Sequence, residues 1–261
     1  MDCLERKAQM KIMTWSGNVA LVTGAPSGIG RAVALAFAGE GVRVAVTDIN
    51  TDGGQETVRK IERAGGESVF LKCDVRREDE TQAMIEGVVK EWGRIDYACN
   101  NAGIHNDLPG VMAEVDLDLW DRIMAVNLTG VFLCMKYEIL QMVKQGGGVI
   151  VNMASMAGLI AEPGSSAYTA AKHGVMGLTK AAALDHISDG IRINAVCPAC
   201  IDTPMLASAP EEVRQYLKSL HPIGRFGEPE EVAGSVMWLC SDLAGFATGT
   251  GVALNGGVLF N

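Results

Sequence analysis

The sequence lacks any uninterrupted apolar run of the roughly 18–20 residues that a membrane-spanning helix requires. It is also short of positive charge: 22 Lys and Arg stand against 31 Asp and Glu, which gives a net charge of −9. This balance argues against nucleic acid or an anionic membrane as a partner. Residues 1–18 contain no apolar signal-peptide core, so we expect them to form a mobile extension of a cytoplasmic protein.

The cysteine pattern gives no disulfide framework. The seven cysteines are odd in number and lie mostly in apolar segments, which fits reduced thiols in the cytoplasm. Cys197 and Cys200 form a C-x-x-C, a spacing found in redox pairs and metal sites. No second C-x-x-C and no histidine cluster at ligand spacing accompanies them. We therefore predict no metal ion and leave the role of the two cysteines open.

The length and the order of patterns indicate one α/β domain over residues 19–261. The chain has 261 residues, of which 48% are hydrophobic, and we see no internal repeat or linker. Strand and helix patterns alternate, which predicts a parallel sheet with helices on both faces. The predicted strands are 19–23, 42–47, 68–73, 95–99, 149–151, 191–196 and 252–254. The predicted helices are a pattern starting near Ala32, then 57–64, 79–92, 117–143, 167–187, 211–220 and 229–239.

A glycine loop joins the first predicted strand to the first helix. Gly24-Ala-Pro-Ser-Gly28-Ile-Gly30 follows the strand directly. A strand, a glycine loop and a helix in this order point free backbone N–H groups and a helix dipole at a phosphate. The spacing G-x3-G-x-G differs from the commoner G-x-G-x-x-G dinucleotide pattern. We interpret the loop as a phosphate site, with a plain tight turn as the alternative.

Asp48 ends the second predicted strand. A carboxylate about 20 residues after the glycine loop can accept hydrogen bonds from the adenosine ribose hydroxyls. It would repel the 2′-phosphate of NADP, so the sequence favours NAD. The alternative is a solvated loop carboxylate, since Asn50, Asp52 and two glycines follow.

The stretch from Ser155 to Lys172 carries the strongest candidate chemistry. Tyr168 and Lys172 are four residues apart in a predicted helix, so they share one face. A neighbouring cation lowers the pKa of a phenol, which suits the pair to general acid/base chemistry. Ser155 follows the strand 149–151 and lies at its carboxyl end, where open α/β sheets bind ligands. Asn127 interrupts the buried face of helix 117–143, so its amide either stitches the backbone or serves the site.

Taken together, these motifs resemble the short-chain dehydrogenase/reductase family over nearly all of the chain after residue 18. The segment from Thr23 to Gly30 is similar to the family's nucleotide loop, and Asn100-Asn101-Ala102-Gly103 to its NNAG segment. The resemblance implies a Rossmann-type doubly wound fold and reversible hydride transfer between a nicotinamide cofactor and an alcohol or ketone. It also implies a catalytic tetrad of Asn127, Ser155, Tyr168 and Lys172.

The resemblance assigns each tetrad residue a role. Tyr168 exchanges the alcohol proton and Ser155 stabilises charge on the substrate oxygen. Lys172 lowers the Tyr168 pKa and holds the nicotinamide ribose, while Asn127 anchors a water. The cofactor contacts implied, besides Tyr168 and Lys172, are Gly24, Ser27, Gly28, Ile29, Gly30, Asp48, Asp74, Val75, Asn100, Asn101, Ala102, Gly103, Pro198, Ile201 and Thr203. The family also packs the two long helices 117–143 and 167–187 against a partner subunit, which implies a homotetramer or a dimer.

The sequence departs from the family pattern at three positions, and the roles of several other residues stay open. Pro26 removes a donor from the glycine loop, Ala199 replaces a usual glycine, and Asn255 replaces a usual Asp. His105 and Glu162 either face the substrate or are ordinary loop residues. Leu159, Ile160, Met205 and Leu206 suggest an apolar pocket for an alicyclic, aromatic or steroid-like secondary alcohol, and the stretch after Thr203, up to about Pro222, suggests a mobile lid. The alternatives to an NAD-dependent alcohol dehydrogenase are a 3-oxoacyl-thioester reductase and a non-catalytic dinucleotide-binding regulator.

Overall fold

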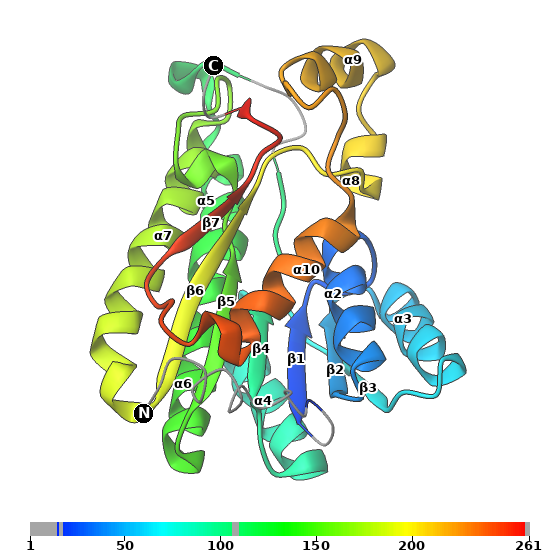
Figure 1. The fold of residues 1–261 in the computed structure, drawn as a ribbon. Helices are drawn as coiled ribbons and strands as arrows, with labels where there is room; N and C mark the ends of the chain where they lie inside the picture. Colours follow the sequence, from blue (N-terminus) through cyan, green and yellow to red (C-terminus); the bar gives the residue numbers. More distant parts are fainter. Residues whose placement is uncertain (1–14, 16–17, 106–109, 259–261) are drawn as a thin grey trace, which may run out of the picture.

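In the computed structural model, which describes residues 15, 18–105 and 110–258, seven parallel strands form one sheet with helices on both faces (Figure 1). The strands are β1 Val19–Thr23, β2 Arg43–Asp48, β3 Ser68–Lys72, β4 Tyr97–Asn100, β5 Gly148–Met153, β6 Ile191–Pro198 and β7 Gly251–Leu254. The predicted doubly wound fold is therefore confirmed. The predicted N-terminal extension lies, except for Trp15 and Asn18, outside the described residues.

The strand order is β3-β2-β1-β4-β5-β6-β7, so the direction of winding reverses between β1 and β4. At this point the chain leaves β1 and β4 toward opposite faces, and their carboxyl ends open a crevice. Ligands of open α/β sheets bind in such a crevice. The segments that follow these two strands are the glycine loop and the NNAG segment, so the topology brings the two motifs together.

Two helical layers cover the sheet. One face carries α2 Gly28–Gly39, α3 Thr51–Arg63 and α10 Pro229–Cys240; in Figure 1, α2 and α10 lie in front of the strands. The other face carries α4 Glu78–Trp92, α6 Gly130–Gln145 and α7 Ser166–His186. Each layer has its own buried apolar cluster, because strands buried on both faces direct alternate side chains into each layer.

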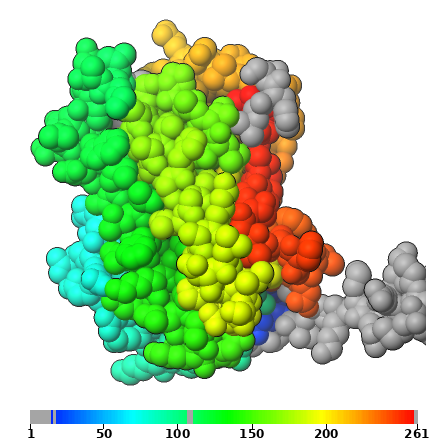
Figure 2. All heavy atoms as spheres, turned by 90° about the vertical axis from the view of Figure 1, so that its left-hand side faces the viewer, coloured from blue at the N-terminus to red at the C-terminus, as the bar shows by residue number. Residues whose placement is uncertain are grey.

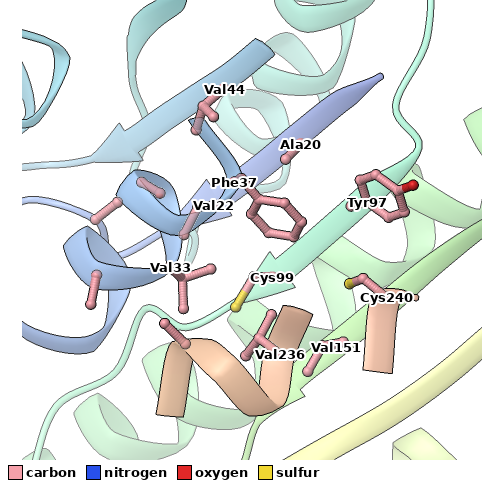
Figure 3. Packing of buried hydrophobic residues seen from close by; sticks show 14 of the residues in the cluster. Ala20, Val22, Val33, Phe37, Val44, Tyr97, Cys99, Val151, Val236 and Cys240 are labelled. Atoms are coloured by element: carbon pink, nitrogen blue, oxygen red, sulfur yellow. The ribbon is translucent and has the colours of Figure 1, made fainter. Parts of the chain in front are cut away.

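The core of the first layer lies between α2, α10 and the central strands (Figure 3). The rings of Phe37 and Tyr97 stack with their centres 5.5 Å apart and their planes at 13°. Cys99 and Val236 fill the space beside them, and Val151 of β5 completes this part of the cluster. Aromatic stacking of this kind adds to the free energy gained from apolar burial.

α3 begins six residues earlier than the predicted helix. The prediction was wrong here because it treated Gly53 and Gly54 as loop residues. The side-chain oxygen of Asn50 accepts a 3.0 Å hydrogen bond from the Gly53 N–H and starts the helix. A Cβ on Gly54 would lie 2.1 Å from the Phe70 ring, so close packing on β3 requires a glycine inside the helix.

The predicted helix 117–143 is one continuous helical stretch with a defect in the middle. α5 Leu117–Met124 runs into a π-helical turn, Ala125–Thr129, and then into α6. The stretch Leu117–Gln145 is long and apolar enough by composition to cross a membrane, but half of its most apolar window is buried within the fold. We interpret it as a core helix of the second layer, and the π turn becomes important at the site.

The predicted lid contains two short helices, α8 Pro204–Ala207 and α9 Glu211–Ser219. Both lie beyond the carboxyl end of β6, over the edge of the sheet where the crevice opens (Figure 1). Thr203 caps α8. Its side chain also lies close to Gly28, because a Cβ on Gly28 would be 3.1 Å from Cγ2 of Thr203. The lid segment therefore rests against the glycine loop.

Candidate active site

The proposed tetrad gathers at the carboxyl end of β5. Ser155 lies just beyond this strand, and Tyr168 and Lys172 lie one turn apart at the start of α7. The Lys172 ammonium donates a 2.7 Å hydrogen bond to the Met153 carbonyl, which fixes the otherwise flexible side chain. Its nitrogen lies 5.5 Å from the centre of the Tyr168 ring. The helix thus holds a cation beside a phenol.

Burial changes the acidity of both groups. It raises the pKa of Tyr168 to about 12, although a hydrogen bond with Ser155 acts in the opposite direction and Glu162 adds to the rise. It lowers the pKa of Lys172 to about 8. Removal from water disfavours the charged form of each group. At neutral pH the buried phenol is therefore protonated and can donate its proton, and the lowering of its pKa by Lys172 stays a prediction.

Ser155 is oriented from two sides. Its hydroxyl oxygen accepts a 3.1 Å hydrogen bond from the Ala157 N–H and so caps the short 3-10 helix Met156–Gly158. The same hydroxyl hydrogen-bonds the Tyr168 phenol. A substrate oxygen placed between these two hydroxyl groups would meet a proton donor and a second hydrogen-bond partner.

Asn127 stands in the π turn, fully buried. Its side-chain oxygen accepts a 2.8 Å bond from the Ile104 N–H, and its amide nitrogen donates a 2.7 Å bond to the Ile104 carbonyl. Of the two roles that the sequence leaves open, the side chain performs the first, stitching the backbone after the NNAG segment. A Cβ on Gly103 would lie 3.0 Å from the Asn127 oxygen and 3.7 Å from the Lys172 nitrogen, so Asn127 and Lys172 meet at this glycine.

The NNAG segment closes the crevice against the glycine loop. The Asn101 amide donates to the carbonyls of Gly24 and Thr23 at 2.8 and 3.1 Å. The Thr23 hydroxyl in turn accepts from the N–H groups of Asn101 and Ala102. Gly24 has a φ of +65°, and a Cβ there would lie 2.6 Å from Cα of Ala102. Asn101 thus shapes the crevice through the backbone, and Gly24 has to be a glycine.

The opening of α2 fits a pyrophosphate. Ser27 caps the helix without a side-chain hydrogen bond, and the first turn, which includes Ile29, carries no acidic residue. Its backbone N–H groups therefore stay available for an anion. Gly28 has a φ of +51°, and a Cβ on Gly30 would lie 2.1 Å from the Gly24 carbonyl oxygen. These glycines leave a cradle that other side chains would fill, so the crevice suits the phosphates of a dinucleotide.

Pro26 does not disrupt the glycine loop. The Arg31 guanidinium donates to the Pro26 carbonyl and, at 3.0 Å, to the Thr57 hydroxyl. Thr57 also donates to the Ala25 carbonyl at 2.8 Å. Arg31 and Thr57 therefore tie the loop, including its proline, to α2 and α3.

The two acidic strand-end residues differ in their surroundings. Asp48 accepts a 2.7 Å bond from the Asn50 N–H, while partial burial raises its pKa. Asp74 is paired with Arg76 at 2.6 Å, and the hydrogen bonds from Arg76 lower its pKa. Val75 packs on α6, where a Cβ on Gly130 would lie 2.8 Å from a Val75 methyl group. Of these two carboxylates, Asp74 is paired with an arginine, whereas Asp48 accepts from a backbone N–H.

The side chain of Asn100 lies away from the crevice. It is buried, and its amide nitrogen donates to the Glu138 carboxyl at 2.9 Å and to the Asn152 oxygen at 3.0 Å. Burial raises the pKa of Glu138 to about 7. This network ties α6 to β4 and β5, so any contact of Asn100 with a cofactor is left to its backbone.

The segment after β6 lies beside the crevice. Pro198 still pairs with Leu254 of β7, and the Ala199 N–H donates to the Leu254 carbonyl at 2.9 Å. No non-glycine residue in the described ranges has a positive φ, so alanine at 199 is not strained. Ile201 is buried and bridges to Gly227, which leaves mainly its backbone for ligand contacts.

Cys197 and Cys200 form no disulfide with each other and differ in their surroundings. Both belong to the six free thiols of the described residues. Cys197 is buried with its sulfur 3.6 Å from that of Met176, whereas Cys200 is half-buried on the side of Glu162 and Tyr168. Burial raises the pKa of each thiol to about 11. In the described part of the chain, no cluster of three or more His, Cys, Asp and Glu side chains could hold a metal ion.

His105 and Glu162 meet beside Tyr168. The His105 Nε2 atom lies 3.3 Å from a Glu162 carboxylate oxygen, and the His105 and Tyr168 rings have their centres 4.4 Å apart. The sequence left both residues open because they stand 57 positions apart in two loops. Only the fold places the NNAG segment next to the loop between Ser155 and Tyr168.

Known proteins resemble this chain over almost its whole length. The family described as "Enoyl-(Acyl carrier protein) reductase" matches residues 24–259. A 2,5-dichloro-2,5-cyclohexadiene-1,4-diol dehydrogenase of Sphingobium indicum is 44% identical over 247 residues, 93% of this chain and 97% of the relative. A cyclohexanol dehydrogenase of Acinetobacter is 45% identical over 248 residues, 94% of this chain and 97% of the relative. A 3-oxoacyl-[acyl-carrier-protein] reductase of Thermotoga maritima is 39% identical over 247 residues, 95% of this chain and 100% of the relative.

Proposed function

The chain belongs to the short-chain dehydrogenase/reductase family, and we propose that it is an NAD-dependent dehydrogenase that oxidises alicyclic secondary alcohols to ketones. That it is an oxidoreductase using a nicotinamide dinucleotide follows from its membership. The observation that carries the proposal is the meeting of Ser155, Tyr168 and Lys172 next to the glycine crevice. A regulator without catalysis does not need this arrangement.

In the proposed reaction the protein handles the proton. A nicotinamide cofactor held in the crevice would supply the hydride chemistry at the substrate carbon. In the reductive direction the neutral Tyr168 phenol donates its proton to the substrate oxygen, while Ser155 hydrogen-bonds the same oxygen. The phenolate that Tyr168 then carries is stabilised by the Lys172 ammonium nearby. Oxidation reverses these steps, so it is favoured by high pH and reduction by low pH.

The cofactor assignment to NAD rests on Asp48. Its carboxylate stands at the end of β2, the strand that follows the phosphate loop, where it can accept hydrogen bonds from ribose hydroxyls. A 2′-phosphate there would face this negative charge. Arg31 is the nearest sequence candidate to offset it, and its guanidinium is engaged with Pro26 and Thr57.

The substrate assignment to alicyclic alcohols has two supports. Leu159, Ile160 and Met205 are large apolar residues that stay exposed, the first two in the segment after β5 and Met205 in α8 after β6. Two relatives with more than 40% identity are named for alcohols of six-membered rings. Exposed apolar side chains gain free energy when a hydrocarbon ring covers them.

A 3-oxoacyl-thioester reductase is the second candidate, and the Thermotoga maritima relative favours it. This reaction would run with NADPH in the usual case of such enzymes, which conflicts with Asp48. Acetoacetyl thioester with NADPH, compared with cyclohexanone and NADH, separates the two candidates. We expect the second pair of substrates to be turned over faster.

We further propose a homotetramer or dimer in the cytoplasm. α6 and α7 form one broad face of the molecule (Figure 2), and a shallow groove on it is lined by Leu128, Thr129, Phe132, Gly174 and Leu178. Leu140 and Leu184 are also exposed on these helices, and Ile187 is exposed directly after α7. Covering them with the same face of a second copy removes apolar surface from water. The free thiols of the described residues fit a reducing compartment.

A panel of alcohols and ketones, followed by NADH absorbance, tests the proposed function. Cyclohexanol, a linear secondary alcohol of the same carbon number and a sugar should be oxidised in that order of kcat/KM. Turnover of the sugar alone, or of none of the three with either NAD or NADP, would contradict the proposal.

A further inference from the structure

His105 and Glu162 form a polar pair that the proton transfer does not use. His105 follows Ile104, whose backbone is held on both sides by Asn127. Glu162 stands in the loop before α7, where its own N–H donates to the Thr169 hydroxyl at 3.3 Å. The 3.3 Å separation of His105 Nε2 and Glu162 Oε1 joins these two loops.

The pair flanks the reacting phenol. The His105 ring is tilted at 55° to the Tyr168 ring with centres 4.4 Å apart. Glu162 is close enough for its charge to raise the pKa of Tyr168. About a third of each side chain of the pair is exposed, 31% for His105 and 33% for Glu162, so a ligand at Tyr168 can reach both.

The chemistry of the pair selects among substituents. A carboxylate accepts hydrogen bonds, and an imidazole donates or accepts according to its tautomer. A hydroxyl group both donates and accepts, so it can bond to both members at once. An anionic substituent would be repelled by Glu162, and a hydrocarbon placed against the pair would remove water from the carboxylate without replacing its hydrogen bonds.

The neighbours of the pair are apolar. Leu159 and Ile160 precede Glu162 in the same loop and stay exposed. A substrate that fits these surroundings has a hydrocarbon body with one oxygen at Ser155 and Tyr168 and a second polar group at the pair. We infer that His105 and Glu162 bind a second hydroxyl group of the substrate, so that the enzyme prefers cyclic diols to cyclic alcohols with a single hydroxyl. This inference rests on the proposed function and narrows its substrate class.

The test compares kcat/KM for the isomeric cyclohexanediols with that for cyclohexanol, at saturating NAD. The wild type should prefer at least one diol isomer by about tenfold or more, as expected of a hydrogen bond to a charged group. Glu162→Gln and His105→Phe should lose most of this preference, measured as the ratio of the diol to the cyclohexanol kcat/KM within each variant. Phenylalanine at 105 keeps a ring against Tyr168, so it removes the hydrogen bond with little loss of packing. The loss should fall mainly on KM, because the second hydroxyl does not react.

A second histidine–carboxylate pair serves as the control. His186 and Asp189 lie 2.8 Å apart at the other end of α7. Asp189→Asn should leave both substrates unaffected. Equal losses on diol and cyclohexanol in Glu162→Gln would show that the pair only ties the loops together and would overturn the inference.

Two further outcomes are separated by the same assay. Turnover of cyclohexanol without a diol preference overturns this inference and leaves the proposed function standing, whereas turnover of neither overturns both. Aminocyclohexanol is the third arm, since an ammonium group would also pair with Glu162. If the enzyme prefers the amine more strongly than any diol, the pair binds a cation and not a hydroxyl group, which would contradict the inference.

Discussion

The ammonium nitrogen of Lys172 lies 5.5 Å from the centre of the Tyr168 ring, and burial moves the pKa values of the two groups in opposite directions. The pKa of Tyr168 rises to about 12 and that of Lys172 falls to about 8. At neutral pH the pair is therefore a neutral phenol beside an ammonium. Proton donation by Tyr168 creates the ion pair that Lys172 stabilises, which links catalysis to the charge of the lysine.

This link predicts a pH profile. The reductive kcat/KM of the wild type should fall above about pH 8, where Lys172 loses its proton. Lys172→Met should be slower at every pH by about 10²-fold or more and should lack this transition. The measurement is ketone reduction from pH 6 to 10 at saturating NADH. A transition that persists unchanged in Lys172→Met would assign it to another group.

Cofactor choice should follow from Asp48. Contact between the Asp48 carboxylate and a 2′-phosphate would cost several kcal/mol, and a tenfold ratio corresponds to about 1.4 kcal/mol. We therefore expect kcat/KM with NAD to exceed that with NADP by on the order of 10²-fold. Asp48→Ala should reduce the ratio of kcat/KM with NAD to kcat/KM with NADP, mainly by weakening NAD binding. Asp52 is an exposed carboxylate in the first turn of α3. Asp52→Ala is the control and should change kcat/KM with neither NAD nor NADP. Equal efficiency with both cofactors in the wild type would show that Asp48 does not face the ribose.

The buried carboxyl of Glu138 predicts how stability depends on pH. Its pKa is raised from 4.5 to about 7 by burial, so the folded state holds the proton more tightly than the unfolded state. Its contribution to stability is complete below pH 4.5 and is lost as the pH rises through about 7. Glu138→Gln has no charge to bury and can still accept from Asn100.

Denaturant unfolding at pH 5 and pH 8.5 measures this effect. Between these values the wild type should lose on the order of 3 kcal/mol relative to Glu138→Gln, from about 1.4 kcal/mol for each pKa unit. Glu91→Gln, an exposed residue of α4, should follow the wild type. A constant difference between wild type and Glu138→Gln at the two pH values would mean that Glu138 is charged in the folded state.

The exposed faces of α6 and α7 predict self-association. Light scattering should give a dimer or tetramer for the wild type, and Phe132→Glu with Leu184→Glu should shift it toward the 27.6 kDa monomer, because each places a charge in the contact. Val213→Glu on α9 is the control at a different exposed apolar position. A wild type that is monomeric at micromolar concentration would contradict this expectation.

The order of strands and helices could be predicted from the sequence because buried parallel strands are short apolar runs between polar ends. Helix starts were harder. Gly53 and Gly54 resemble a loop, yet the Asn50 cap and the Phe70 ring, which come from separate elements, place them inside α3. The requirement for a glycine is a property of the packed pair of elements, and no local pattern contains it.

In the candidate site, too, local features could be predicted from the sequence and features that depend on packing could not. The spacing of Tyr168 and Lys172 on one helix is local, so the sequence predicts their proximity. The pKa of Tyr168 also depends on burial, which only the packed fold determines and which raises it. The meeting of His105 with Glu162 likewise depends on two loops that the sheet brings together.

The most direct test of the account is the rate of NADH formation from a cyclic secondary alcohol by wild type and Tyr168→Phe, with cofactor affinity measured on the same samples. This substitution removes the phenol oxygen and keeps the ring. We predict that turnover falls by 10²–10⁴-fold, the usual contribution of a general acid/base, while NADH binding changes little. A variant that keeps more than about a tenth of the wild-type rate would contradict the assignment of Tyr168 as the proton-transferring group.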